Sequence, residues 1–182
     1  MATRPSLSCQ ALQVYEANLQ WSNARFPEIP QLVTEANIAS CLLKIGRVEE
    51  CIARMRVNFA ATQRECGSED ELTLIAASTF SNALAEAQDY AGCTQFIQEN
   101  SVLDTAGRVL GPENIATIYL RRNQARALYQ PSEAPLGDVR RAVEILEDVS
   151  AISNRVLGRD HPGAQKIQQH LDAAREKLAH AE

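Results

Sequence analysis

The chain alternates long stretches of mixed apolar and polar residues with short interruptions that contain proline or glycine. Within the stretches, apolar residues recur every three or four positions, as in Val139, Val143, Leu146 and Val149, which is the period of an amphipathic helix. Proline breaks a helix and glycine weakens it, so the interruptions are typical of turns between helices. We expect eight helices, over residues 6–24, 31–45, 48–65, 70–88, 90–108, 113–129, 138–156 and 162–179.

The connections between these expected helices are mostly short, and short connections make neighbouring helices run antiparallel. Composition supports the same interpretation, because the chain is rich in alanine and leucine, whereas aromatic residues make up only 5%. Alanine and leucine favour helix, while sheets favour β-branched and aromatic side chains. The sequence therefore predicts an all-α protein.

Similar segments recur between the helices and indicate an internal repeat. Gly67, Gly111 and Gly158 each follow an expected helix and stand 44 and 47 residues apart. A glycine at this place accepts the left-handed conformation that ends a helix. A second set of matching turns lies at 46–51, 88–93 and 137–142. Two-helix units that repeat in this way are typical of an α-solenoid, which we expect to be right-handed.

Two of the repeated segments resemble a known family. The run NIASCLLKIGRVEEC at 37–51 resembles the tetratricopeptide (TPR) pattern N-L-A-x-x-Y-x-x-x-G-K-Y-x-x-A, and VLGRDHP at 156–162 is similar to the linker of the repeats in kinesin light chains. The second unit departs from the pattern, with Thr79, Ser81 and Gln88 in place of Asn, Ala and Gly. The resemblance implies a TPR-like fold, peptide or protein partners, and no common catalytic activity.

The repeat also predicts how the chain is organised. We expect one TPR-like domain over 1–182, built of antiparallel helix pairs. Its expected parts are a half unit at 6–29, units at 30–69, 70–112 and 113–161, and a C-terminal capping helix at 162–182.

The first helix of each unit supplies the candidate binding residues, because in such solenoids these helices line the concave face. An Asn there can donate one hydrogen bond to the backbone of an extended peptide and accept another from it. Corresponding positions carry Asn37, Thr79 and Asn123. The candidate peptide-binding residues are Asn37, Lys44, Thr79, Arg122, Asn123 and Arg126. The alternative is that these are exposed polar residues without a ligand.

A local group of arginines adds a second possibility for docking. It consists of Arg121, Arg122, Arg126, Arg140 and Arg141. These side chains form either a solvated face or a docking point for acidic side chains of a partner. Nucleic acid is disfavoured, because the formal net charge of the chain is −5 and few aromatic residues lie nearby for stacking.

The cysteines and histidines indicate structure rather than chemistry. Cys51 and Cys93 align with Ala142, a small position where helices meet, and no C-x-x-C pair occurs. We therefore expect structural thiols, a reducing cytoplasmic location, no metal and no cofactor.

His161 lies in a repeated turn, and His170 and His180 lie on the last helix without a catalytic motif around them. We expect no enzyme; an enzyme would need a cleft with perturbed ionisable groups.

The most direct interpretation is a protein–protein interaction module that binds a partner segment on its concave face. The alternative is a structural or self-associating subunit of a larger complex, which would use its ends or convex face. In that case the residues Leu12, Tyr15, Leu19 and Trp21 on the first helix would need to be covered by another chain or copy. The chain has no apolar run long enough to insert in a membrane.

Overall fold

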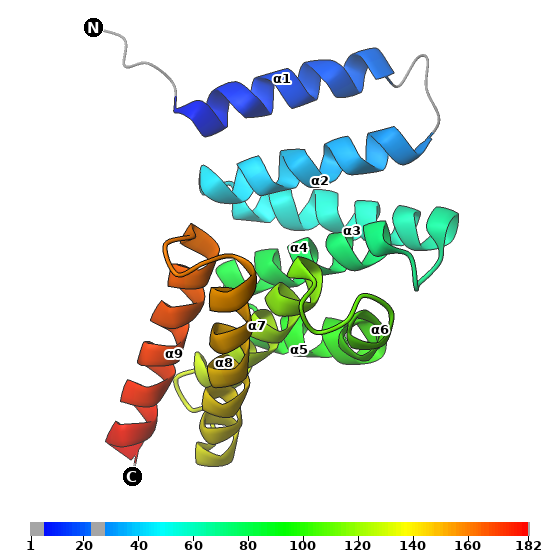
Figure 1. Ribbon diagram of the computed structural model, residues 1–182. Coiled ribbons are helices and arrows are strands. Elements are labelled where there is room, and N and C mark those ends of the chain that lie inside the picture. The colour runs from blue at the N-terminus through cyan, green and yellow to red at the C-terminus, as the bar shows by residue number, and fades with distance from the viewer. Residues whose placement is uncertain (1–5, 23–27, 182) are drawn as a thin grey trace, which may run out of the picture. The chain divides into compact units, whose positions relative to one another are not determined.

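The computed structural model describes residues 6–22 and 28–181, without the side chains of residues 21–30. The described residues form nine helices and no strand, which confirms the all-α prediction (Figure 1). The helices are α1 (Leu7–Ser22), α2 (Glu28–Lys44), α3 (Val48–Cys66), α4 (Glu71–Glu86), α5 (Tyr90–Glu99), α6 (Val102–Val109), α7 (Ile115–Tyr129), α8 (Leu136–Val156) and α9 (Pro162–Ala181). They divide into an N-terminal body (Met1–Ala87) and a C-terminal body (Gln88–Glu182).

In the N-terminal body, each helix packs against the next one in sequence. Helix α1 contacts α2, α2 contacts α3, α3 contacts α4, and α2 also contacts α4. The buried side chains of this body come from all four helices and include Leu12, Leu42, Met55 and Leu74. Burial of each such side chain stabilises the fold by about 1.5–3 kcal/mol relative to exposure. No single helix could cover its own apolar stripe.

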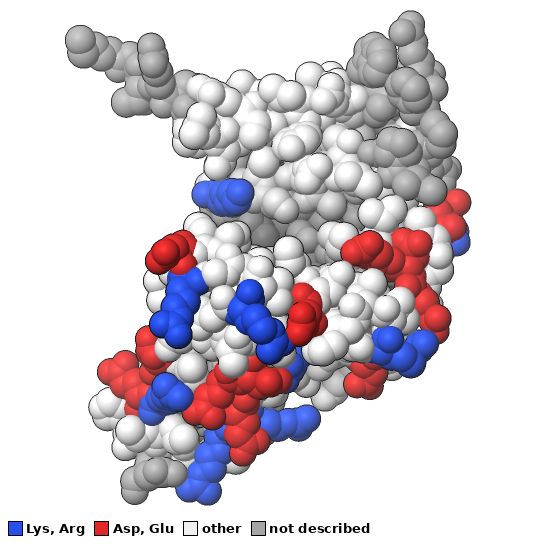
Figure 2. All heavy atoms as spheres, viewed as in Figure 1, with Lys and Arg blue, Asp and Glu red and all other residues white. Residues whose placement is uncertain are grey.

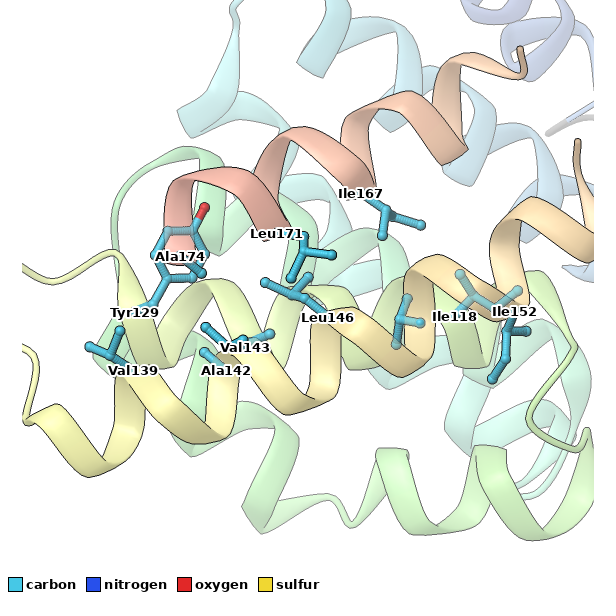
Figure 3. Close-up of a cluster of buried hydrophobic side chains, with 12 residues drawn as sticks. Ile118, Tyr129, Val139, Ala142, Val143, Leu146, Ile152, Ile167, Leu171 and Ala174 are labelled. Atoms are coloured by element: carbon cyan, nitrogen blue, oxygen red, sulfur yellow. The ribbon is translucent and has the colours of Figure 1, made fainter. Parts of the chain in front are cut away.

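In the C-terminal body, α7 is the central helix. It contacts α5, α6, α8 and α9, and α8 packs along α9. Figure 3 shows side chains of α7, α8 and α9 meeting in one buried cluster, with Ile118, Leu146 and Leu171 among its members. The periodic apolar positions of α8 that the sequence singled out, Val139, Val143, Leu146 and Val149, all belong to this cluster.

The linkers between units end one helix and begin the next in the same way. Gly67, Gly111 and Gly158 have φ values of 90°, 82° and 88°, the left-handed region that glycine adopts without steric cost. The next helix is then capped by a side chain in all three linkers, and in the third His161 Nδ1 accepts a hydrogen bond from the Gly163 amide at 3.0 Å. Asp70 accepts a hydrogen bond from the Leu72 amide at 2.8 Å, and Asn114 accepts one from the Ala116 amide at 2.9 Å.

The prediction of a single helix over 90–108 is wrong, because this segment forms α5 and α6. The side-chain amide of Asn100 donates to the Phe96 carbonyl at 2.9 Å and ends α5, and Ser101 adopts φ 50°. Asn and Ser compete in this way with helical hydrogen bonds. The break lets α6 bury Ala106, whose carbonyl accepts from the Thr117 hydroxyl of α7 at 3.2 Å.

The prediction of matching turns at 46–51, 88–93 and 137–142 holds for only two of the three. Gly46 and Gln88 both have positive φ, at 80° and 62°. Gly137 instead lies in the first turn of α8, which begins directly after Pro135. The Pro-containing loop that precedes α8 replaces the tight glycine turn, since Pro135 sets the backbone at the helix start.

The small positions shared by the repeats are buried, as expected. Cys51, Cys93 and Ala142 expose none of their surface. The Cys51 thiol donates to the Ala39 carbonyl of α2 at 3.4 Å. Burial raises the pKa of Cys51 and of Cys93 to about 12, so both are neutral thiols at physiological pH.

One buried polar pair lies at the edge of the C-terminal core. The His170 Nδ1 of α9 lies 2.9 Å from the Tyr129 hydroxyl of α7, and both side chains are buried. Burial, and after it the positive charges of Arg126, Arg122 and Lys166, lower the pKa of His170 to about 3. The imidazole is therefore neutral in the folded protein, whereas it gains a proton near pH 6.5 when unfolded.

We predict that this histidine makes stability depend on pH. Between about pH 6.5 and about pH 3 the unfolded chain binds a proton that folded His170 does not, so the free energy of unfolding falls as the pH falls through that window. The variant His170→Gln should lose this part of the pH dependence in urea unfolding curves, while His180→Gln, at an exposed imidazole, should keep it. Equal pH dependence in the wild type and His170→Gln would contradict the assignment.

Candidate functional site

A hollow of about 200 Å³ opens between three helices of the N-terminal body. We call it the α2–α4 hollow. It is lined by Leu32, Val33, Ala36 and Asn37 of α2, Asn58 and Thr62 of α3, and Leu72 and Ile75 of α4. No lining side chain carries a charge, so the hollow is apolar with a few amide and hydroxyl groups.

The hollow has a buried floor and an open rim. Asn58 and Thr62 of α3 are buried and form the floor. Val33 of α2 and Ile75 of α4 are exposed and stand at the rim. Exposed apolar side chains beside a concave site are typical of surfaces that a ligand covers.

The structure places the predicted binding residues of the N-terminal body on two helices. Asn37 is half-buried and lines the hollow. Thr79 lies one turn beyond Ile75 on α4, and its hydroxyl donates to the Ile75 carbonyl at 3.1 Å, so it can still accept a hydrogen bond. Lys44 is exposed at the end of α2 and does not line the hollow.

The three predicted residues of the C-terminal body are brought together on α7, but they are buried. Arg122 lies with its guanidinium carbon 4.8 Å from the centre of the Tyr119 ring. It donates to Asn123 Oδ1 from Nε at 3.2 Å and from Nη2 at 3.0 Å. Arg126 donates to Gln130 Oε1 at 3.3 Å. Because Asn123 is fully buried, it does not stand on an open surface as the sequence suggested, and its part in binding stays a prediction.

The arginine group expected from the sequence does not form one open patch. Arg122 and Arg126 are buried, whereas Arg140 and Arg141 are exposed on α8. Arg121 pairs with Asp148 of α8 at 2.6 Å. Pairing and burial leave little of the group available as a single docking point.

Sequence reasoning missed the floor of the hollow, because it looked only at the first helix of each unit. Asn58 lies on α3 in the same buried stripe as Cys51, Met55 and Thr62. An Asn in a stripe of core positions was the available signal, since buried amides are costly unless they are hydrogen-bonded. Ile75 and Leu72 carried no such signal, because apolar residues on a helix are expected in any core.

Within the described ranges, no group of three or more His, Cys, Asp or Glu side chains could hold a metal ion. Those ranges also contain no helix with both the length and the apolar character needed to cross a bilayer.

Comparison with known protein families gives no match, and comparison with curated proteins gives none either. Among the solved structures that are similar to the chain, two are of a candidate kinesin light chain from Podosopora anserina with nearly identical TPR-like repeats, one of them with a glutamine replaced by methionine. The substituted form has a TM-score of 0.69 and covers 95% of this chain and 79% of its own, and the other has a TM-score of 0.67 and covers 95% and 80%.

Both structures are 19% identical to the chain in sequence, so the similarity is one of fold. It agrees with the TPR-like segments at 37–51 and 156–162. The chain is therefore an all-α protein with a TPR-like repeat fold.

Proposed function

We propose that the chain is a protein-interaction module that binds a segment of a partner protein at the α2–α4 hollow. The observation that carries this proposal is the hollow itself, where Asn37 stands beside the exposed apolar side chains Val33 and Ile75. An apolar rim supplies affinity, and an amide that both donates and accepts can pair with a peptide backbone. The general role of TPR-like folds supports the same function.

The other predicted residues extend this proposal along the same helices. Lys44 would meet the partner at the end of α2, where an acidic side chain would suit it, and Thr79 would accept a hydrogen bond beyond the rim. On the C-terminal body, Arg122, Asn123 and Arg126 stay predicted binding residues, but because they are buried a partner would reach them only if the packing around α7 opened.

We also propose that the chain has no catalytic step, no cofactor, no nucleic-acid partner and no membrane insertion. The sequence carries no motif or pattern that is typical of any of these functions. A reducing cytoplasmic location suits the buried thiols Cys51 and Cys93.

We predict that Ile75→Asp weakens peptide binding by about tenfold or more, because a carboxylate at the rim would have to be desolvated by an apolar ligand. Peptides are first selected on the wild-type chain from a displayed random library, and their dissociation constants are then measured by fluorescence anisotropy. Ile115→Asp is the matched control, since Ile75 is 38% exposed and Ile115, on the C-terminal body, is 49% exposed.

The control variant should bind the selected peptides like the wild type. If the selection yields no binding peptide, or if Ile75→Asp and Ile115→Asp bind equally well, the proposed site is wrong.

A second candidate function is self-association through α1, and the uncharged outer face of this helix favours it. Leu7 and Val14 are 84% and 60% exposed. Over residues 7–20, where the side chains of α1 are described, the exposed positions are Leu7, Gln10, Gln13, Val14, Ala17, Asn18 and Gln20. In the view of Figure 2, the described surface over α1 is free of charged side chains.

This face differs from the one that the sequence suggested. Leu12 is buried against α2, and Tyr15 and Leu19 are half-buried, so packing within the body already covers Leu12 and part of the other two. Trp21 lies outside the described side chains. The only charge of α1, Glu16, is turned toward Arg54 of α3 at 3.7 Å. A face without charges can meet its own copy without repulsion, and amides both donate and accept.

We predict that the chain associates weakly and that Leu7→Glu/Val14→Glu prevents it. One helix face is smaller than a standard interface, so the mass from light scattering should rise with concentration rather than stay at that of a dimer. The matched control, Ile115→Glu/Val156→Glu, adds the same charge at exposed positions of the C-terminal body and should behave like the wild type. A wild-type chain that stays monomeric at every concentration would eliminate this candidate.

A further inference from the structure

A second hollow of the N-terminal body, of about 370 Å³, lies between α2 and α3. We call it the α2–α3 hollow. Its lining includes four apolar and two charged side chains, which are Leu32, Glu35, Ala53, Arg54, Val57 and Ala61. Val57 is 70% exposed in the middle of α3, and Ala53, one turn before it, is exposed as well. Apolar side chains that line a hollow and stay exposed are typical of a surface that a partner covers.

The α2–α3 hollow is separate from the α2–α4 hollow, although Leu32 and Asn58 border both. Glu35 lines only the α2–α3 hollow, and Ala36 lines only the α2–α4 hollow. Successive positions on a helix are about 100° apart, so the two hollows open on different sides of α2. Among the described helices of this body, α3 contacts α2 and α4, and only α2 lines the α2–α3 hollow with it. This flank of α3 is therefore open to a partner.

The lining of the α2–α3 hollow favours a helix over an extended segment. An extended segment leaves its backbone amides and carbonyls unpaired unless the site bonds to them. Apart from Glu35 and Arg54, the polar side chain among the described lining residues is Asn58, which is 3% exposed. A helix satisfies its own backbone groups and can lay an apolar face into such a groove.

A cluster of ion pairs gives one edge of the hollow its charge. The Arg54 Nη1 donates to both carboxylate oxygens of Glu35, at 3.0 and 3.2 Å. Its Nε donates to Glu50 at 3.4 Å, and its Nη2 lies 3.7 Å from a carboxylate oxygen of Glu16 on α1. Arg47 also pairs with Glu50. Three carboxylates therefore share two guanidinium groups, which leaves one negative charge in excess.

The three carboxylates are within reach of a cation from outside. The side chains of Glu16, Glu35 and Glu50 are 36%, 25% and 33% exposed, and a carboxylate can accept several hydrogen bonds. Arg56 is exposed on α3 but does not line the hollow. Since the whole chain has a formal net charge of −5, a basic partner is favoured over an acidic one and over a second copy of the chain.

We infer that the α2–α3 hollow docks a basic amphipathic helix of a partner protein. An apolar side chain of that helix fills the space between Ala53, Val57 and Ala61, where the two alanines leave room for it. A lysine or arginine beside this side chain meets the carboxylates of Glu35 and Glu50. The surface differs from the α2–α4 hollow, so the inference goes beyond the proposed function and does not depend on it.

Two synthetic peptides test the inference on the full chain. Both form short amphipathic helices with a leucine face, and the polar face is lysine in one and glutamate in the other. Each is titrated into the isotope-labelled chain, and binding is followed by NMR shifts. We expect the lysine peptide to shift the residues that line the α2–α3 hollow and to bind about tenfold or more tightly than the glutamate peptide. The variant Ile75→Asp should bind it like the wild type, since Ile75 lines only the other hollow.

Two variants change the two features of the hollow separately. Ala53→Trp fills the apolar space, and Glu35→Gln removes one carboxylate, so each should weaken binding of the lysine peptide by about fivefold or more. The matched controls are Ala151→Trp and Glu144→Gln, at exposed positions of α8 in the C-terminal body, and they should bind like the wild type. If Glu35→Gln does not fold, Ala53→Trp and its control decide alone.

Equal binding of the two peptides, shifts confined to residues outside the α2–α3 hollow, or unchanged binding by either folded variant would overturn the inference. Equal weakening in the controls would also overturn it, because the peptide would then follow only the net charge of the chain. An increase of mass with concentration that Ala53→Trp abolishes in light scattering would instead assign the hollow to a second copy. Peptides selected at the α2–α4 hollow would still need Ile75 in each of these cases, which would keep the proposed function.

Discussion

The structure depends on one constraint: each helix has an apolar stripe that only its neighbours can cover. In the N-terminal body, α2 is covered by α1, α3 and α4, and in the C-terminal body α7 is covered by four other helices. Short linkers hold these neighbours in place, and the left-handed glycines at 67, 111 and 158 reverse the chain between them. The small buried residues Cys51, Cys93 and Ala142 then let the helices approach closely.

Two polar side chains, Asn58 and His170, are buried among the apolar positions of these stripes. Asn58 and His170 each have one atom bonded within the fold and one buried atom without a partner among the described residues. His170 is held neutral at the edge of a dense core. Asn58 differs because it lies at the bottom of a hollow with an exposed rim. Burial of the His170 imidazole therefore makes the stability of the fold depend on pH.

The sequence was sufficient for the helices and for the repeat, because periodicity and glycine placement are local properties. It was insufficient where a single side chain determined the place at which a helix ends or begins. Asn100 ends α5 through its own side chain, and Pro135 moves the start of α8 so that Gly137 is no longer in a turn. For the site, sequence correspondence found Asn37, which lines the hollow. It did not find that Asn123, its counterpart on α7, is buried beside Arg122, because burial depends on the rotation of a helix against its neighbours.

Hydrogen–deuterium exchange with and without a selected peptide tests the central claim, that a partner segment binds where α2, α3 and α4 enclose the hollow. Binding there should slow the exchange of backbone amides around residues 32–37, 58–62 and 72–75 and leave α8 and α9 unchanged. Slower exchange confined to α1, or to the C-terminal body, would contradict the account.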